Sequence, residues 1–285
     1  MAARELPSFD FVVATVDRVD PLEVFLDSLE RQTHRRFRVL LVDQNEDKRL
    51  SLLVERRRSL EIVHLRSARG LSRARNAALE HVTAGVVAFP DDDCVYPPDL
   101  LERVALRLAD PGIDGLTGRA VGLDGRSSMS WRTDAAMLTD ENLWNRAISY
   151  TIFLRRHVVE TVGSFDEQLG LGSGSPWSSG EETDYLVRAV RSGARIAYDP
   201  TLTVVHDETP LSGFDLRARG YRDGASVGYI LRKNRYPARV IARMLVRPIG
   251  GALLSLLRGN VARARFRTAT LRGRITGYRS VGPSR

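Results

Sequence analysis

The chain has a single cysteine, and its sequence shows neither the pattern of a signal peptide nor a long unbroken apolar run. Cys94 alone cannot form an internal disulfide framework or a thiolate metal cluster. No charged stretch followed by an apolar stretch precedes Phe9, so we expect no signal peptide. No uninterrupted apolar run reaches the length of a membrane span, which argues against a spanning helix. These absences favour a cytoplasmic protein.

Lysine is also scarce. The chain has 43 basic residues against 35 acidic ones, a formal net charge of +8, yet only Lys48 and Lys233 are lysines. Because a guanidinium can bind phosphate through two hydrogen bonds, this composition favours phosphorylated or other anionic partners. A codon preference for arginine throughout the genome explains the same composition equally well.

The hydrophobic pattern predicts one α/β domain with a tail in this chain of 285 residues. Short apolar runs alternate with helix-like segments, the first of which begins at Asp20-Pro21 with Glu23 in its first turn. The predicted strands are 9–15, 37–42, 61–65 and 86–89, and further helices are predicted at 47–60 and 72–82. This alternation predicts a mostly parallel central sheet flanked by helices, with ligands at the carboxyl ends of the strands. Thr15, Asp43 and the acids after Phe89 would lie at that edge.

The second half is less regular. Residues 122–142 are polar and predict an excursion over the surface, and order returns at 148–154. A loop rich in glycine and serine, 170–180, leads into a predicted helix at 181–192 and a strand at 195–206. From Gly213 onward the chain is helical and basic in character.

Three consecutive aspartates end the fourth predicted strand. In Phe89-Pro90-Asp91-Asp92-Asp93, adjacent carboxylates repel and raise one another's pKa unless a cation neutralises them. Asp91 and Asp93, two positions apart, can face the same side and offer oxygens to a hard divalent ion. An acidic surface turn is the alternative.

Several stretches match the motifs of a known family, in that family's order. They are Val13-Ala14-Thr15-Val16, Val39-Leu40-Leu41-Val42-Asp43-Gln44-Asn45, Gly70-Leu71-Ser72-Arg73-Ala74-Arg75-Asn76-Ala77 and the three aspartates. With these motifs, residues 9 to 206 resemble a family 2 glycosyltransferase, an inverting enzyme of the GT-A fold. The resemblance implies a catalytic domain at 1–210, followed by a basic helical segment at 211–285.

The resemblance also implies a donor site and a metal site. Thr15 and Asp43 would hold the nucleotide, with the Asp43 carboxylate accepting a hydrogen bond from the imide of uracil or thymine. The other residues assigned to the donor are Asn45, Gly70, Arg75, Asn76, Asp91 and Asp92, and those assigned to a divalent metal, Mn²⁺ or Mg²⁺, are Asp91, Asp93 and His206. Three of these residues have alternative roles. Asp43 can be a turn former, Arg75 part of a solvated basic face and His206 a structural histidine.

The motif Gly180-Glu181-Glu182-Thr183-Asp184 resembles the family's Glu-Asp motif, whose second acid is the catalytic base. Here the second acid is Glu182 where aspartate is commoner, so Glu181 remains an alternative base, and Asp184 is assigned to orienting the base or the acceptor. Acids in a first helical turn are also favourable for the helix itself. Trp177 is a candidate for stacking on an acceptor sugar or for core packing.

The residues and the resemblance together predict a hexosyl transfer by single displacement. A nucleoside-diphosphate sugar, with uridine favoured, would donate to a glycan or a lipid-linked saccharide in polysaccharide or cell-envelope synthesis, and no nucleic-acid partner is expected. The apolar stretch 240–257 with arginines around it predicts peripheral contact with the inner face of the cell membrane, or else packing on the catalytic domain or in a homodimer. One rival function is a nucleotidyltransferase, but that class usually has a glycine-rich loop after its first strand and this loop has no glycine. A second rival is a non-catalytic sugar-binding module.

Overall fold

The computed structural model describes residues 5–127, 130–206 and 213–280, which form two compact units. The first unit comprises Met1–Phe165 and Tyr185–Glu208, and the second comprises Asp166–Asp184 and Thr209–Arg285. The expected border between residues 210 and 211 lies outside the described residues. The segment Asp166–Asp184 groups with the C-terminal helices, although it lies far from them in the sequence.

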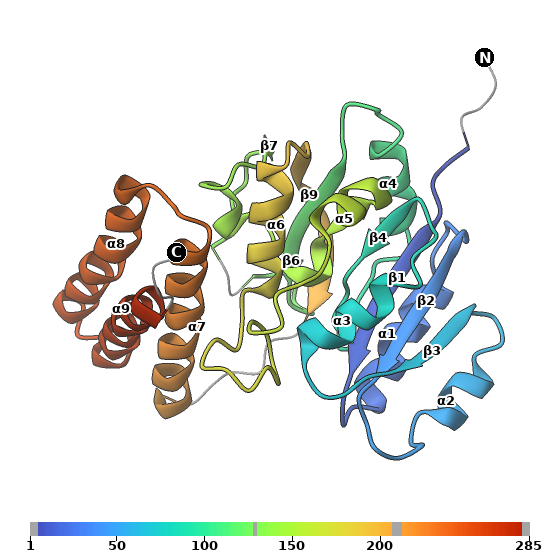
Figure 1. Ribbon diagram of the computed structural model, residues 1–285, viewed down its shortest axis with the longest axis horizontal. Helices are drawn as coiled ribbons and strands as arrows, with labels where there is room; N and C mark the ends of the chain where they lie inside the picture. The colour runs from blue at the N-terminus through green and yellow to red at the C-terminus, as the bar shows by residue number, and fades with distance from the viewer. Residues whose placement is uncertain (1–4, 128–129, 207–212, 281–285) are drawn as a thin grey trace. The chain divides into compact units, whose positions relative to one another are not determined.

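The first unit is built on one mixed sheet, which has nine strands among the described residues. Its order is β3-β2-β1-β4-β8-β6-β9-β5, with β7 paired to β9. The strands are β1 (Phe9–Thr15), β2 (Phe37–Asp43), β3 (Ile62–Arg66), β4 (Val86–Ala88), β5 (Cys94–Val95), β6 (Gly115–Val121), β7 (Ala136–Met137), β8 (Phe153–Arg155) and β9 (Ile196–His206). Figure 1 shows β1, β2 and β3 side by side.

The four strands predicted from the first ninety residues are confirmed, and they pair in parallel. The helices of this unit are α1 (Asp20–Glu30), α2 (Ser51–Arg56), α3 (Leu71–Leu79), α4 (Leu100–Arg107) and α5 (Arg156–Val162), with short 3₁₀ turns η1 (Leu143–Asn145) and η2 (Ser149–Thr151). Helix α6 (Glu181–Arg191) runs from the second unit into the first.

Helix α2 is shorter than the predicted 47–60. The Asp47 carboxylate accepts a hydrogen bond from the Arg49 backbone N–H at 3.0 Å, an Asx turn that competes with helical hydrogen bonding. At the other end Arg57 leaves the helical conformation. The polar residues before Ser51 therefore form a turn instead of a first helical turn.

Strand β6 was not predicted because its sequence, GLTGRAV, contains two glycines. A Cβ at Gly118 would lie 2.2 Å from the carbonyl oxygen of Leu202 on β9, and the pairing of β6 with β9 shifts register between Thr117 and Arg119. The glycine thus permits close approach of the neighbouring backbone at an irregular point of the sheet. Helices α4 and α5 also lie outside the predicted elements.

In the second unit, helices α7 (Gly213–Lys233), α8 (Ala238–Leu257) and α9 (Val261–Ser280) lie side by side (Figure 1). Gly224 and Gly228 of α7 face α9, and Gly273 and Gly277 of α9 face α7. A Cβ at Gly228 would lie 2.1 Å from the Arg274 carbonyl oxygen, and one at Gly277 would lie 1.9 Å from that of Ala225. The two helices therefore pack backbone against backbone, as small residues spaced four apart allow.

Helix α8 contains a proline that α9 compensates. Pro248 has no N–H, so the carbonyl of Met244, four residues earlier, lacks its usual helical donor. The Arg274 guanidinium of α9 donates a hydrogen bond to that carbonyl. Of the helices in the described residues, α8 alone has the length and apolar composition of a membrane span, by those two criteria only.

Candidate active site

The ends of β1, β2 and β4 bring together the residues predicted to hold a donor. Thr15 and Asp43 are paired partners at the last positions of β1 and β2. Asp91 forms an isolated parallel bridge with Ala14, which continues the β1–β4 pairing beyond Phe89. The carboxyl edge of the parallel strands is thus lined by the acids and the threonine that the sequence indicated.

Asp91, Asp93 and His206 form one cluster at this edge. One potential ligand atom from each lies within 4.8 Å of the others, about the span of opposite ligands on a single divalent ion, roughly 4–5 Å. His206 reaches the cluster because it pairs with Cys94 across β9 and β5. Its ring stacks on Tyr150 with the centroids 4.7 Å apart and the planes 5° from parallel, which fixes the plane of the imidazole.

Cationic and hydroxyl groups surround these carboxylates. Arg18 donates to Asp92 at 2.9 Å and also to Asp93. Asp91 accepts a hydrogen bond from the Ser149 hydroxyl at 3.0 Å and a longer one, of 3.4 Å, from buried Arg75. The site therefore offsets its concentrated negative charge with two arginines.

The pKa values of Asp92 and Asp93 move in opposite directions. Burial raises the pKa of Asp92 above its usual value and the Asp93 charge adds to the rise, while Thr15 and Arg18 oppose it. Burial would also raise the pKa of Asp93, but the hydrogen bond with His206 and the charge of Arg18 outweigh burial and lower that pKa. Within this pair, Asp93 is the more readily ionised member.

Four donors surround the Asp43 carboxylate. Its Oδ1 accepts from the backbone and side-chain nitrogens of Asn45 at 2.9 and 2.7 Å, and its Oδ2 accepts from Arg66 at 2.6 Å and contacts His64 Nε2 at 3.1 Å. Asn45 in turn accepts a hydrogen bond from the backbone N–H of Asp17 at 2.7 Å. Asp43 and Asn45 are buried, and together they fix the loops after β1 and β2.

Three residues assigned to the donor belong to α3, where Gly70 is the N-cap and Arg75 and Asn76 lie in the middle of the helix. Gly70 has a φ of +136°, which favours glycine, and its N–H donates to the Gln44 side chain at 2.7 Å. The Asn76 side-chain amide accepts a hydrogen bond from the Phe165 backbone N–H at 2.7 Å and donates one to the Phe165 carbonyl at 3.1 Å. Arg75 thus reaches the acidic cluster, whereas Asn76 bonds to the backbone of Phe165.

The acids of the second motif begin helix α6 in the second unit. Glu181 is buried and Glu182 is half-buried. Asp184 is fully buried, and its two oxygens accept from Lys233 at 2.9 Å and Asn234 at 2.8 Å. Lys233 also donates to Asp166 at 2.7 Å, so one lysine of α7 joins two acids that lie far from it in the sequence.

Trp177 stacks on Tyr229 with the centroids 4.3 Å apart and the planes 27° from parallel. Tyr229 donates its hydroxyl to Asp166 at 2.8 Å. The ring of Trp177 therefore packs within the second unit, which agrees with the packing alternative for this residue.

Several residues at these sites were not singled out from the sequence. The sequence position of Arg18 could have indicated it, because Arg18 follows β1 in the loop beside the acids. Lys233 could also have been noticed, because it is one of only two lysines in an arginine-rich chain. Ser149 and Tyr150 lie in the short turn η2 and match no motif, so only the fold places them beside Asp91 and His206.

The chain belongs to glycosyl transferase family 2, whose family model matches residues 10–164. It is 26% identical over 224 residues to the pre-mycofactocin glycosyltransferase of Mycobacterium tuberculosis, a match that covers 74% of this chain and 44% of that protein. It is 25% identical over 244 residues to the succinoglycan biosynthesis protein ExoM of Rhizobium meliloti, covering 81% of this chain and 77% of ExoM. The chain thus spans less than half the length of the mycobacterial relative.

Solved structures share the fold. TarS of S. aureus superposes with a TM-score of 0.62 and 18% identity, over 92% of this chain and 55% of that one. The mannosyltransferase PcManGT of Pyrobaculum calidifontis, in complex with GDP-Man and Mn²⁺, superposes with a TM-score of 0.64 and 17% identity, over 96% of this chain and 88% of that one. The expected α/β fold of the GT-A type, with a helical C-terminal segment, is confirmed.

Proposed function

We infer that the protein transfers a sugar from a nucleoside-diphosphate donor to a hydroxyl of a glycan or lipid-linked acceptor, with inversion and with help from a divalent metal. The observation that supports this most is the cluster of Asp91, Asp93 and His206 at the carboxyl edge of the sheet in a family 2 chain. A sugar-binding module without catalysis has no need of such a cluster.

The residues present fit a divalent ion. Two carboxylates and an imidazole form a mixed oxygen and nitrogen set suited to Mn²⁺ or Mg²⁺. When bound there, the ion would neutralise charge on the diphosphate that leaves. Arg75 and Arg18, which contact the same acids, would add positive charge beside the departing group.

Asp43 needs one change of partner to recognise a base. A carboxylate accepts about four hydrogen bonds, and the bonds from Asn45, His64 and Arg66 already use that capacity. His64 and Arg66 are partly exposed, so a uracil imide would replace one of these two donors. Asn45 would keep the other oxygen in place.

Glu182 is the acid we assign as the base. Asp184 has both oxygens bonded to Lys233 and Asn234, which suits an anchor for α6 better than proton transfer. Glu181 is buried, whereas Glu182 keeps some exposure at the start of the helix. In a single displacement the Glu182 carboxylate would take the proton of the acceptor hydroxyl as that oxygen attacks the anomeric carbon.

The relatives support a saccharide substrate without fixing it. The similar structures include TarS with UDP-GlcNAc and PcManGT with GDP-Man, so donors with different nucleosides occur on this fold. ExoM is named for succinoglycan biosynthesis, which supports a role in polysaccharide assembly. We place the reaction in the cytoplasm, where nucleotide sugars are made.

A thermal-shift screen of nucleoside-diphosphate sugars, with and without Mn²⁺ or Mg²⁺, tests the donor. A ligand at a hundred times its dissociation constant stabilises the folded protein by about 2.7 kcal/mol. We expect a metal-dependent rise with a uridine-linked sugar and slow hydrolysis of the same donor. Stabilisation without any hydrolysis or transfer would indicate a binding module instead. Release of pyrophosphate from a nucleoside triphosphate and a sugar 1-phosphate would indicate a nucleotidyltransferase.

A further inference from the structure

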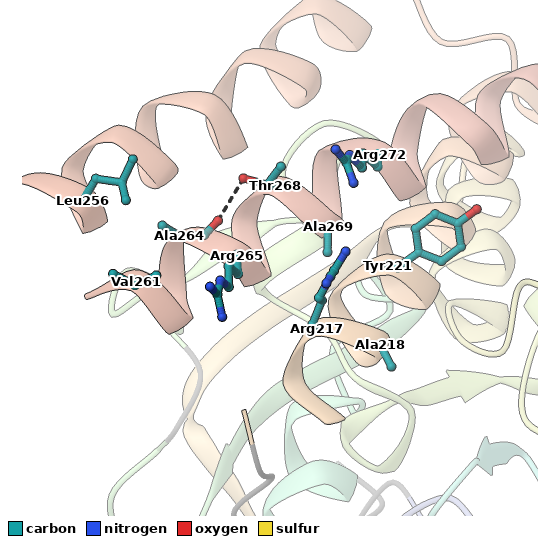
Figure 2. Close-up of a pocket in the computed structure, with 10 residues that line it drawn as sticks. All are labelled: Arg217, Ala218, Tyr221, Leu256, Val261, Ala264, Arg265, Thr268, Ala269 and Arg272. Atoms are coloured by element: carbon teal, nitrogen blue, oxygen red, sulfur yellow. Dashed lines mark hydrogen bonds between the residues drawn. The ribbon is translucent and has the colours of Figure 1, made fainter. Parts of the chain in front are cut away.

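The second unit contains a cavity of about 710 Å³ between its three C-terminal helices. Figure 2 shows its lining, which mixes arginine with small or apolar side chains. Arg217 comes from α7, Arg265 and Arg272 from α9, and Leu256 from the end of α8. Among the described residues the lining contains no acid, so the cavity combines positive charge with an apolar wall.

The three arginines are available to a ligand. Each is exposed, and no ion pair joins any of them to a residue in the described part of the chain. The sequence after Asp223 contains fourteen Arg and Lys residues and no Asp or Glu, so helices α8 and α9 carry positive charge without an acid of their own. Burial and the charges of Arg247 and Arg267 lower the pKa of Arg274 to about 10, as crowded positive charge requires.

An exposed apolar surface adjoins the cavity. Leu256 and Val261, which line it, are 54% and 50% exposed, and Leu253 and Leu257 on the same end of α8 are 59% and 86% exposed. Because α7 and α9 pack through glycines, their longer side chains project away from that contact. Large apolar side chains beside unpaired arginines are typical of surfaces that enter the interfacial layer of a membrane.

We propose that this surface of the second unit binds anionic phospholipid, with Arg217, Arg265 and Arg272 on the lipid phosphate and the apolar end of α8 among the acyl chains. The guanidinium groups match a phosphate in charge and in hydrogen-bonding geometry. The apolar wall suits the hydrocarbon attached to that phosphate, which a soluble anion lacks. This surface belongs to one unit, and the proposal does not depend on the transfer reaction.

Sedimentation of the full chain with vesicles tests the proposal. We expect binding to vesicles of phosphatidylcholine with a third phosphatidylglycerol at low salt, and little binding to pure phosphatidylcholine. Each arginine removed should lower the partition constant about five-fold, so Arg217→Gln with Arg265→Gln should lower it about twenty-five-fold. Leu253→Ser with Leu257→Ser should lower it as well.

Matched controls come from the first unit. Leu123 is 76% exposed and Arg126 is exposed, both in the turn after β6, so Leu123→Ser and Arg126→Gln should leave vesicle binding unchanged. Equal losses in control and test variants would overturn the proposal, as would equal binding to neutral and anionic vesicles. Wild-type protein that resists extraction with alkaline carbonate would also overturn it, because α8 would then be an inserted helix.

Two further measurements distinguish a phospholipid from other possible occupants of this surface. Short-chain phosphatidylglycerol below its micelle concentration should raise the melting temperature, whereas inorganic phosphate at the same concentration should not. An equal rise with phosphate alone would make the cavity a site for a soluble anion and overturn the lipid assignment. A wild-type dimer that becomes monomeric in the Leu253→Ser, Leu257→Ser variant would assign the apolar surface to a second copy of the chain, against the proposal.

Discussion

At the residue scale, the Asp93 carboxylate makes two kinds of contact. It accepts hydrogen bonds from Arg18 and His206, and it offers an oxygen to the cluster with Asp91. Despite burial, the pKa of Asp93 is lowered by the hydrogen bond with His206 and the charge of Arg18, which favours the ionised form that a hard cation would need.

Asp93→Asn should therefore weaken Mn²⁺-dependent binding of the nucleoside diphosphate by at least about ten-fold, because it removes an anionic ligand. Titration calorimetry with and without Mn²⁺ measures the change. Asp27→Asn, at a partly buried ion pair between α1 and Arg57, is the control and should bind as the wild type does. Unchanged affinity and unchanged metal dependence in Asp93→Asn would remove Asp93 from the metal site.

Glu182 distinguishes a transferase from a protein that only binds the donor. Glu182→Gln keeps the shape of the side chain but removes its basicity, so the transfer rate should fall by about 10²- to 10⁴-fold. Donor affinity should stay close to the wild-type value, since the proposed donor contacts are at Asp43, Asp91 and Asp93.

Glu181→Gln is the matched control, one residue away in the same helical turn, and should do much less. If the two effects are exchanged, Glu181 is the base. Parallel losses of donor affinity and rate in Glu182→Gln would make Glu182 a donor-site residue, and full activity would exclude it as the base.

At the scale of elements, the contact between α7 and α9 depends on glycine. Gly228→Ala would place a methyl group 2.1 Å from the Arg274 carbonyl, so the helices would have to separate. We expect a loss of about 3 kcal/mol of stability or more. Gly250→Ala in α8, where nothing lies within 4 Å, should instead stabilise by about 0.5–1 kcal/mol. Chemical denaturation followed by circular dichroism compares the two, and similar effects would show that the close packing is unimportant.

Elements with a strong local pattern were predictable and those shaped by distant contacts were not. β1 is rich in β-branched and aromatic residues, and its predicted bounds match the structure. β6 has two glycines where neighbouring strands pass close, β8 at Gly115 and β9 at Gly118, and its own sequence does not reveal these contacts. The site divides in the same way: Asp91 and Asp93 follow a strand end, whereas Ser149 reaches Asp91 only through tertiary structure. Asp184 also has the pattern of a site residue and its orienting role stays a prediction, whereas its partners Lys233 and Asn234 could not be read from that pattern.

At the scale of the whole molecule, stability at acid pH should depend on one buried ion pair distant from the site. Asp10 is fully buried at the start of β1, where Arg38 donates to both its oxygens at 2.6 and 2.9 Å. The backbone N–H groups of Thr83 and Ala84 donate to it as well, at 2.7 and 2.8 Å. Burial would raise the pKa of Asp10, but these hydrogen bonds and the charge of Arg38 outweigh it and lower the pKa.

Because the folded-state pKa is the lower one, the contribution of Asp10 is complete above its unfolded pKa of about 3.9 and is lost as the pH falls through the folded pKa. Asp10→Asn should cost about 3 kcal/mol at pH 7. Urea denaturation of both proteins between pH 7 and pH 2.5 should show this difference shrinking at the acid end. A difference that stays constant with pH would mean that Asp10 is not the group responsible.

The interleaving of the two units along the chain has a consequence for synthesis on the ribosome. Strands β1 to β4 emerge together and can pair early, but β9, which lies between β6 and β5 and brings His206, emerges after the segment Asp166–Asp184. The ion pairs of that segment can form only after α7 has been synthesised, because Lys233 is the cation shared by Asp166 and Asp184. A nascent chain halted before Lys233 would therefore have all the strands of its sheet but leave Asp166 and Asp184 without their cation. Such truncated products should be the form most often captured by chaperones and proteases.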